Sequence, residues 1–188
     1  MMLKIKKIVF LLIMFLCNQS IWSQEINQNE TDTIRLAPGI ITKYIDYKLP
    51  PLRARNIITV TVFPVIREII QGSIVYYYYR VKLDGIYANI EYTDLLSAYK
   101  SITSLEKELR NDLAIDSDYL ENEYLMHNGI AIGYFIESKK VMWYISSHKI
   151  DKSLIFKDDV NSIKLSFEQA MSMIEELKKT KNSFKLQN

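Results

Sequence analysis

A run of four tyrosines, Tyr76 to Tyr79, is followed by Arg80 and Lys82 and forms the most distinctive group of side chains that could bind a ligand. Alternate residues of a strand point to opposite faces, so Tyr76 and Tyr78 should share a face with Arg80 and Lys82. Rings beside basic groups suit stacking on a sugar or docking a peptide. Tyrosine is also a good strand former, so the alternative is that half of these rings pack in the core. Tyr76, Tyr78, Arg80 and Lys82 are the ligand-binding residues that the sequence predicts.

Two histidines, His127 and His148, could supply acid–base or metal chemistry together with a carboxylate such as Glu123 or Asp151. Neither histidine has a partner at the i,i+4 spacing of a helical zinc motif, and zinc needs three or four ligands. Histidines in loops of this kind are usually surface residues. The sequence therefore predicts no metal site, no cofactor and no catalytic residue.

Other groups of charged residues have simpler interpretations. The acidic residues around the start of the second half do not have the spacing of a calcium-binding loop, because apolar residues and no glycine stand between them. They are Asp112, Asp116, Asp118, Glu121 and Glu123. Lys178, Lys179 and Lys181 could bind an anion, but they also suit the solvated C-terminal end of a helix. The five glycines are too scattered to form a phosphate-binding loop, and no Gly-x-Ser-x-Gly elbow is present.

Residues 1–23 have the layout of a secretory signal peptide. Lys4, Lys6 and Lys7 precede the apolar run from Ile8 to Cys17, which at about ten residues is half the length needed to cross a bilayer. Cys17 also occupies the place of a bacterial lipoprotein cysteine, although Leu16 stands where that pattern requires a small residue. We therefore expect export with removal of residues 1–23, and lipid anchoring through Cys17 is the alternative.

Removal of this leader changes the meaning of the composition. The chain has 24 basic and 22 acidic residues, and three of the basic residues belong to the leader. A nearly neutral domain makes no general electrostatic case for nucleic acid. The single cysteine also lies in the leader, so we expect a domain without disulfides, typical of the bacterial periplasm or cell surface.

The periodicity of the remaining chain predicts antiparallel strands and two main helices. A strand over 74–83 and a strand over 86–90 flank Asp84-Gly85, and strands over 119–127 and 130–137 flank Asn128-Gly129, which are both two-residue hairpin signals. Further strands are expected at 57–63, 141–146, 153–156 and 160–165. Residues 40–47 should be a short strand or a segment packed on the flank of the domain, and 65–70 is ambiguous between helix and strand. The first helix should begin at a Thr93 cap and end near Asn111, and the second at the capping box from Ser166 to Gln169.

These elements predict an α+β fold with an antiparallel sheet, built from two strand-meander-then-helix units whose two helices pack on one face. Residues 24–55 should be a flexible or extended segment, residues 56–182 a single domain and residues 183–188 a frayed tail. The sequence favours an exported, non-enzymatic binding module for an unknown protein, peptide or glycan, without a membrane span after processing. Two alternatives remain open: a hydrolase that uses carboxylates or histidine, and an inhibitor or immunity-type protein against a secreted toxin.

Overall fold

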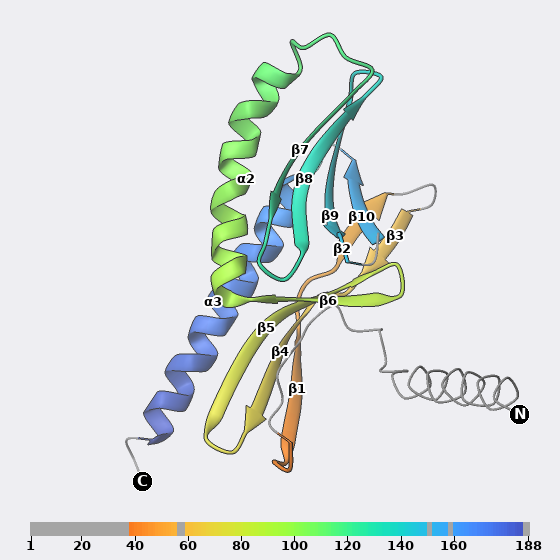
Figure 1. Ribbon diagram of the computed structural model, residues 1–188. Helices are drawn as coiled ribbons and strands as arrows, with labels where there is room; N and C mark the ends of the chain where they lie inside the picture. Colours follow the sequence, from red (N-terminus) through yellow and green to blue (C-terminus); the bar gives the residue numbers. More distant parts are fainter. Residues whose placement is uncertain (1–37, 56–58, 150–151, 158–159, 186–188) are drawn as a thin grey trace, which may run out of the picture.

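The computed structural model describes residues 38–55, 59–149, 152–157 and 160–185. These ranges hold two long helices and three antiparallel sheets, shown in Figure 1. The elements in chain order are β1 (Thr42–Lys48), β2 (Leu52–Arg55), β3 (Thr59–Val62), β4 (Val65–Gln71), β5 (Ile74–Leu83), β6 (Ile86–Glu91), α2 (Tyr92–Asp112), β7 (Tyr119–Leu125), β8 (Ile130–Glu137), β9 (Lys140–Ser147), β10 (Lys152–Lys157) and α3 (Val160–Lys185).

The predicted α+β class is confirmed, and so is the repetition of a strand meander followed by a helix. The first sheet has the order β1-β4-β5-β6 and leads into α2, and the second has the order β10-β9-β8-β7 and leads into α3. The small sheet β2-β3 is inserted between β1 and β4. Helices α2 and α3 contact each other and lie together along one side of the sheets (Figure 1). Neither described helix combines the length and the apolar character that a membrane crossing requires.

The N-terminal part of the chain is described only in part. The predicted signal peptide, Cys17 and the segment up to residue 37 lie outside the described residues. Within the range 24–55, β1 pairs with β4 from Thr42–Gln71 to Lys48–Val65, which confirms the expected short strand before the two prolines. The same range supplies β2, which pairs with β3. The ambiguous stretch 65–70 is the strand β4.

The two predicted hairpins form, but their turns differ. Asp84 and Gly85 have φ angles of 41° and 97°, the left-handed pair that a two-residue turn of type I′ requires. At the other hairpin the Met126 amide donates to the Ile130 carbonyl at 2.8 Å, so the loop contains three residues rather than the two expected. The Asn128 side chain accepts from the Ile130 amide at 3.0 Å, and Gly129 adopts a φ of 82°. This local bond and the left-handed glycine close the longer loop.

Both predicted helix starts are wrong. Helix α2 begins at Tyr92, directly after the strand residue Glu91, and no side chain caps it. Residues 160–165 are not a strand, because they form the first turns of α3. Val160, Ile163 and Phe167 recur at helical spacing and are buried, which favours a helix over the alternating pattern. The predicted tail from residue 183 begins inside α3, which continues to Lys185.

The expected capping residue Ser166 therefore lies within α3, where it serves the core. Its hydroxyl is 3.1 Å from the hydroxyl of Tyr79, and the Tyr79 ring packs edge-on against Phe167 with 5.3 Å between centroids. Burial raises the pKa of Tyr79 far above its ordinary value. A phenol without contact to water needs such a partner for its hydrogen-bonding group, so this contact fixes α3 on the first sheet.

A second attachment of α3 to the first sheet is ionic. The Glu68 carboxylate on β4 is 0% exposed and accepts a hydrogen bond from Tyr47 at 2.9 Å and from Tyr77 at 3.3 Å. Lys181, near the end of α3, donates to the same carboxylate. A buried carboxylate is costly unless it is paired, so this lysine has a structural role. Lys178 also has partners, because it contacts Glu175 at 3.1 Å and lies over the ring of Tyr92.

Replacement of Lys181 by methionine should reduce the free energy of unfolding by about 2 kcal/mol, because Glu68 loses its charged partner and stays buried. Urea denaturation followed by circular dichroism measures the change. Lys179→Met is the matched control, since Lys179 is exposed on the same helix, and its loss should stay within about 0.5 kcal/mol. Equal losses for the two variants would contradict this role of the ion pair.

Candidate functional site

The four predicted ligand-binding residues do share one face of β5, but they are not equally accessible. Tyr76 is 37% exposed and Lys82 is exposed, whereas Tyr78 and Arg80 are each only 6% exposed. The Arg80 guanidinium lies 3.9 Å from the centroid of the Tyr87 ring, and the Lys82 amine lies 5.7 Å from the same centroid. A ligand on this face could reach Tyr76 and Lys82 directly, and the binding role of the face stays a prediction.

The two histidines each contact a carboxylate, in two separate places. His127 Nδ1 lies 2.9 Å from Asp94 Oδ1, and this hydrogen bond followed by the charge of Asp94 raises the pKa of His127. His148 Nε2 lies 2.9 Å from Glu123 Oε2. The other partner considered, Asp151, lies outside the described residues. Among the described residues, no group of three or more acidic, histidine or cysteine side chains is placed to hold a metal ion.

Three of the acidic residues considered above, Asp112, Glu121 and Glu123, lie on opposite sides of one sheet. Asp112 at the end of α2 accepts a hydrogen bond from Tyr134 on the helix-facing side, where Asn122 also contacts it. Glu121 and Glu123 alternate with Asn122 along β7 and therefore lie on the opposite, outer face. Asn122 of β7 thus contacts Asp112 on the side of the helices, whereas its neighbours Glu121 and Glu123 point away from the helices.

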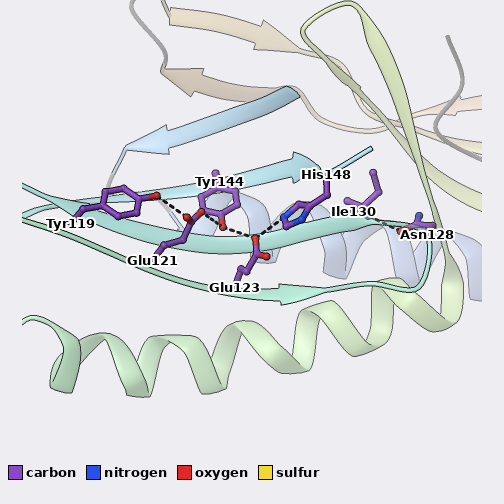
Figure 2. A network of polar contacts seen from close by, with 7 residues as sticks. All are labelled: Tyr119, Glu121, Glu123, Asn128, Ile130, Tyr144 and His148. Atoms are coloured by element: carbon purple, nitrogen blue, oxygen red, sulfur yellow. Dashed lines mark hydrogen bonds and ion pairs between the residues drawn. The ribbon is translucent and has the colours of Figure 1, made fainter. Parts of the chain in front are cut away.

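A chain of polar contacts crosses this outer face from β7 to β9, as Figure 2 shows. The Tyr144 hydroxyl on β9 lies 2.6 Å from Glu121 Oε1 and 2.8 Å from Glu123 Oε2. Tyr119 donates to the other oxygen of Glu121 at 2.7 Å, and His148 completes the chain at Glu123. Two carboxylates of β7 are thus held by two phenols, from β7 and β9, and by the imidazole of His148 in the turn after β9.

Gly133 on the middle strand makes this arrangement possible. It is the register partner of Glu123 on one side and of Tyr144 on the other. Because position 133 has no side chain, the Tyr144 ring can extend across β8 to the carboxylates on β7. A Cβ atom at this position would lie 2.4 Å from the Asn122 carbonyl oxygen, so glycine is also required for the close approach of β7.

The polar chain borders an open depression of about 390 Å³, within the size range of ligand-binding pockets. Its aromatic wall consists of Tyr119, Phe135 and Tyr144. Phe135 lies between the other two rings, with centroid distances of 6.0 Å to Tyr119 and 6.2 Å to Tyr144. Glu121, His148 and three serines complete the lining: Ser146, Ser147 and Ser153. The depression therefore combines ring faces, a carboxylate and small hydroxyl groups.

The two phenols of the depression stay protonated at neutral pH. Burial, followed by the hydrogen bonds to Glu121 and Glu123, raises the pKa of Tyr144 far above its ordinary value. Partial burial against Phe135, followed by the hydrogen bond to Glu121, raises the pKa of Tyr119 to about 12. Each phenol therefore remains a hydrogen-bond donor, and neither removes the negative charge of the carboxylates. Tyr144 has one proton and can donate to only one of its two carboxylates at a time.

Sequence reasoning considered Glu123 and His148 but missed Tyr119, Phe135 and Tyr144 as members of one site. Two local signals were available. The alternation along β7 places Tyr119, Glu121 and Glu123 on one face, and a glycine inside a strand often marks a close approach. The pairing of β7, β8 and β9 that unites these residues depends on strand register, which the individual strands do not specify.

The raised pKa of Tyr119 has a consequence for stability at high pH. Its value of about 12 lies above the ordinary 10.0, so the protonated phenol contributes stability that is complete below pH 10.0 and is lost as the pH rises to about 12. A spectrophotometric titration of the protein and of Tyr119→Phe should give a difference curve with a midpoint near pH 12. A midpoint at the ordinary tyrosine value would contradict the hydrogen bond to Glu121.

We compared the chain with protein-family models, curated protein sequences and solved structures, and none of them matches it. No relative therefore supplies a ligand or a role for any residue. The outer face of the second sheet is where aromatic rings, two carboxylates and an imidazole come together.

Proposed function

We propose that this protein is an exported, non-enzymatic binding module whose ligand occupies the outer face of β7, β8 and β9. The observation that carries the proposal is the depression beside Glu121, walled by three aromatic rings and open to solvent. Helices α2 and α3 lie on the other side of the sheet, so they leave this face available (Figure 1). Exposed rings beside a few polar groups are typical of surfaces that recognise peptides, proteins and glycans.

The export part of the proposal rests on the leader pattern of residues 1–23. A charged start followed by a short apolar run indicates translocation, which would place the depression in the periplasm or at the cell surface. Lipid anchoring through Cys17 would tether the same domain to a membrane. Both destinations are compatible with a ligand outside the cytoplasm.

A hydrolase is the second candidate, and the contact between His148 and Glu123 favours it. A carboxylate can orient an imidazole that acts as a general base, and three serines line the same depression. A serine nucleophile would have to bond to that imidazole. Among the described residues, Glu123 is the side chain that His148 contacts, and no serine hydroxyl donates to it. The binding function therefore has the stronger geometric support.

Ligands of this protein should bind at the outer face of the second sheet. A panel of capped tripeptides and disaccharides, titrated into isotope-labelled protein, should shift amide resonances of β7, β8 and β9 in NMR spectra. Tyr119→Ala should lower the affinity for such a ligand roughly tenfold, because it removes one ring of the aromatic wall. Tyr76→Ala is the matched control, because Tyr76 is an exposed strand tyrosine on the other sheet.

Two results would contradict the proposal. In the first, resonances around Tyr76 and Lys82 respond while those of the second sheet do not, and the face predicted from sequence is then the binding surface. In the second, the protein hydrolyses a p-nitrophenyl ester and His148→Gln abolishes that activity, which would establish the hydrolase instead.

A further inference from the structure

We infer that the ligand of this site presents a cationic side chain, the guanidinium of arginine or the ammonium of lysine, carried by a peptide or protein. The inference rests on the proposed function and specifies its ligand. Three features of the outer face support it: the charge balance of its carboxylates, the row of aromatic rings, and the open shape of the depression.

The two carboxylates of the site lie close together, and neither forms an ion pair with a lysine or an arginine of the described residues. Four other carboxylates of the described residues do form such ion pairs: Asp46 with Arg67, Glu68 with Lys181, Glu106 with Lys164, and Glu175 with Lys178. At the outer face the described partners of Glu121 are the two phenols, and those of Glu123 are Tyr144 and His148. Among the described residues, no lysine or arginine forms an ion pair with Glu121 or Glu123, so a cationic ligand would meet two carboxylates without a Lys or Arg partner.

Tyr144 also has too few protons to donate to both carboxylates at once. Its hydroxyl is within hydrogen-bond distance of both carboxylates, but it can donate to only one of them at a time. The other carboxylate then lies next to the Tyr144 hydroxyl oxygen without receiving a hydrogen bond from it. A cationic group arriving from solvent would supply the missing hydrogens and the missing charge, and carboxylate oxygens can accept more than one hydrogen bond.

The aromatic wall suits the same ligand class. Cations are attracted to ring faces, and among the described residues basic side chains lie over the rings of Tyr44, Tyr87 and Tyr92. Arg80 lies 3.9 Å from the Tyr87 ring centroid, Lys178 lies 3.8 Å from that of Tyr92, and Arg67 lies 5.5 Å from that of Tyr44. The row of Tyr119, Phe135 and Tyr144 has no described cation over it, yet it adjoins Glu121. A ring face next to a carboxylate is the environment in which an arginine or lysine side chain is doubly stabilised.

The shape of the depression favours a side chain of a larger partner. A volume of about 390 Å³ can hold one long side chain with its immediate neighbours. Because the depression is open on the sheet surface, the main chain of a peptide can lie along the strands while one side chain enters. A charged partner would also be attracted from a distance, and salt should weaken this attraction.

The test uses four capped tripeptides, acetyl-Gly-X-Gly-amide, in which X is arginine, lysine, citrulline or norleucine. Citrulline keeps the shape of arginine and norleucine keeps the chain of lysine, but neither carries a charge. In NMR titrations of the full chain, arginine or lysine should bind roughly tenfold more tightly than its neutral counterpart, and added salt should reduce the difference. The two charged peptides also distinguish a guanidinium from an ammonium ligand.

Two variants locate the effect. Glu121→Gln should lower the affinity for the charged peptide roughly tenfold, whereas Glu176→Gln, which removes the same charge from the exposed side of α3, should leave it unchanged. If Glu121→Gln does not fold, Phe135→Leu provides a second measurement, because it removes a ring face and keeps an apolar side chain. Its charged-to-neutral affinity ratio should fall severalfold.

Equal affinity for charged and neutral peptides, or no shift with any of the four, would overturn the cationic ligand class. The proposed binding function would survive that result if disaccharides still shifted the resonances of β7, β8 and β9. The proposed binding function would fail together with the cationic ligand class only if no member of the panel of tripeptides and disaccharides shifted these resonances.

Discussion

Gly133 is the constraint on which the outer face of the second sheet depends. It stands in the middle of β8, where any Cβ atom would collide with the backbone of β7. The absence of a side chain has two effects: β7 can approach closely, and the ring of Tyr144 can reach across β8. Without the second effect, the Tyr144 hydroxyl could not meet Glu121 and Glu123, and the polar chain in Figure 2 would lose its centre.

Helices α2 and α3 support the second sheet on the side opposite to this outer face. Each of the two four-stranded meanders ends in a helix, and the two helices pack against each other on the same side. Tyr79 with Ser166, and Glu68 with Lys181, attach α3 to the first sheet by one neutral and one ionic contact. The core therefore lies between helices and strands, and polar groups on the far side of the second sheet need not contribute to it. That freedom allows Glu121 and Glu123 to stand close together.

Local sequence signals predicted much of this fold. Alternation gave β5 its bounds, Asp84-Gly85 marked a tight turn, and the helical face from Phe167 onward indicated α3. The errors arose where two local patterns competed. Residues 160–165 contain enough apolar and β-branched side chains to suggest a strand, but the buried spacing of Val160 and Ile163 continues into Phe167 and forms a helix. Thr93 has the chemistry of a cap, yet the pairing of Glu91 with Tyr78 carries the strand up to the helix.

The candidate site could be predicted only in part, for a physical reason. Strand alternation correctly placed Tyr76, Tyr78, Arg80 and Lys82 on one face, but it contains no information about what buries Tyr78 and Arg80. Glu123 and His148 were recognised individually as groups with acid–base chemistry. Their assembly with Tyr144 required the register of three strands, and register is set by the packing of the whole sheet.

A double-mutant cycle between Tyr144→Phe and Glu121→Gln tests the central contact most directly, with unfolding free energies measured in urea. We expect a coupling energy of about 1 kcal/mol, because the two side chains share a short hydrogen bond that each single variant removes. Losses that add to within about 0.3 kcal/mol would contradict it, since additive effects indicate that Tyr144 and Glu121 do not interact across β8.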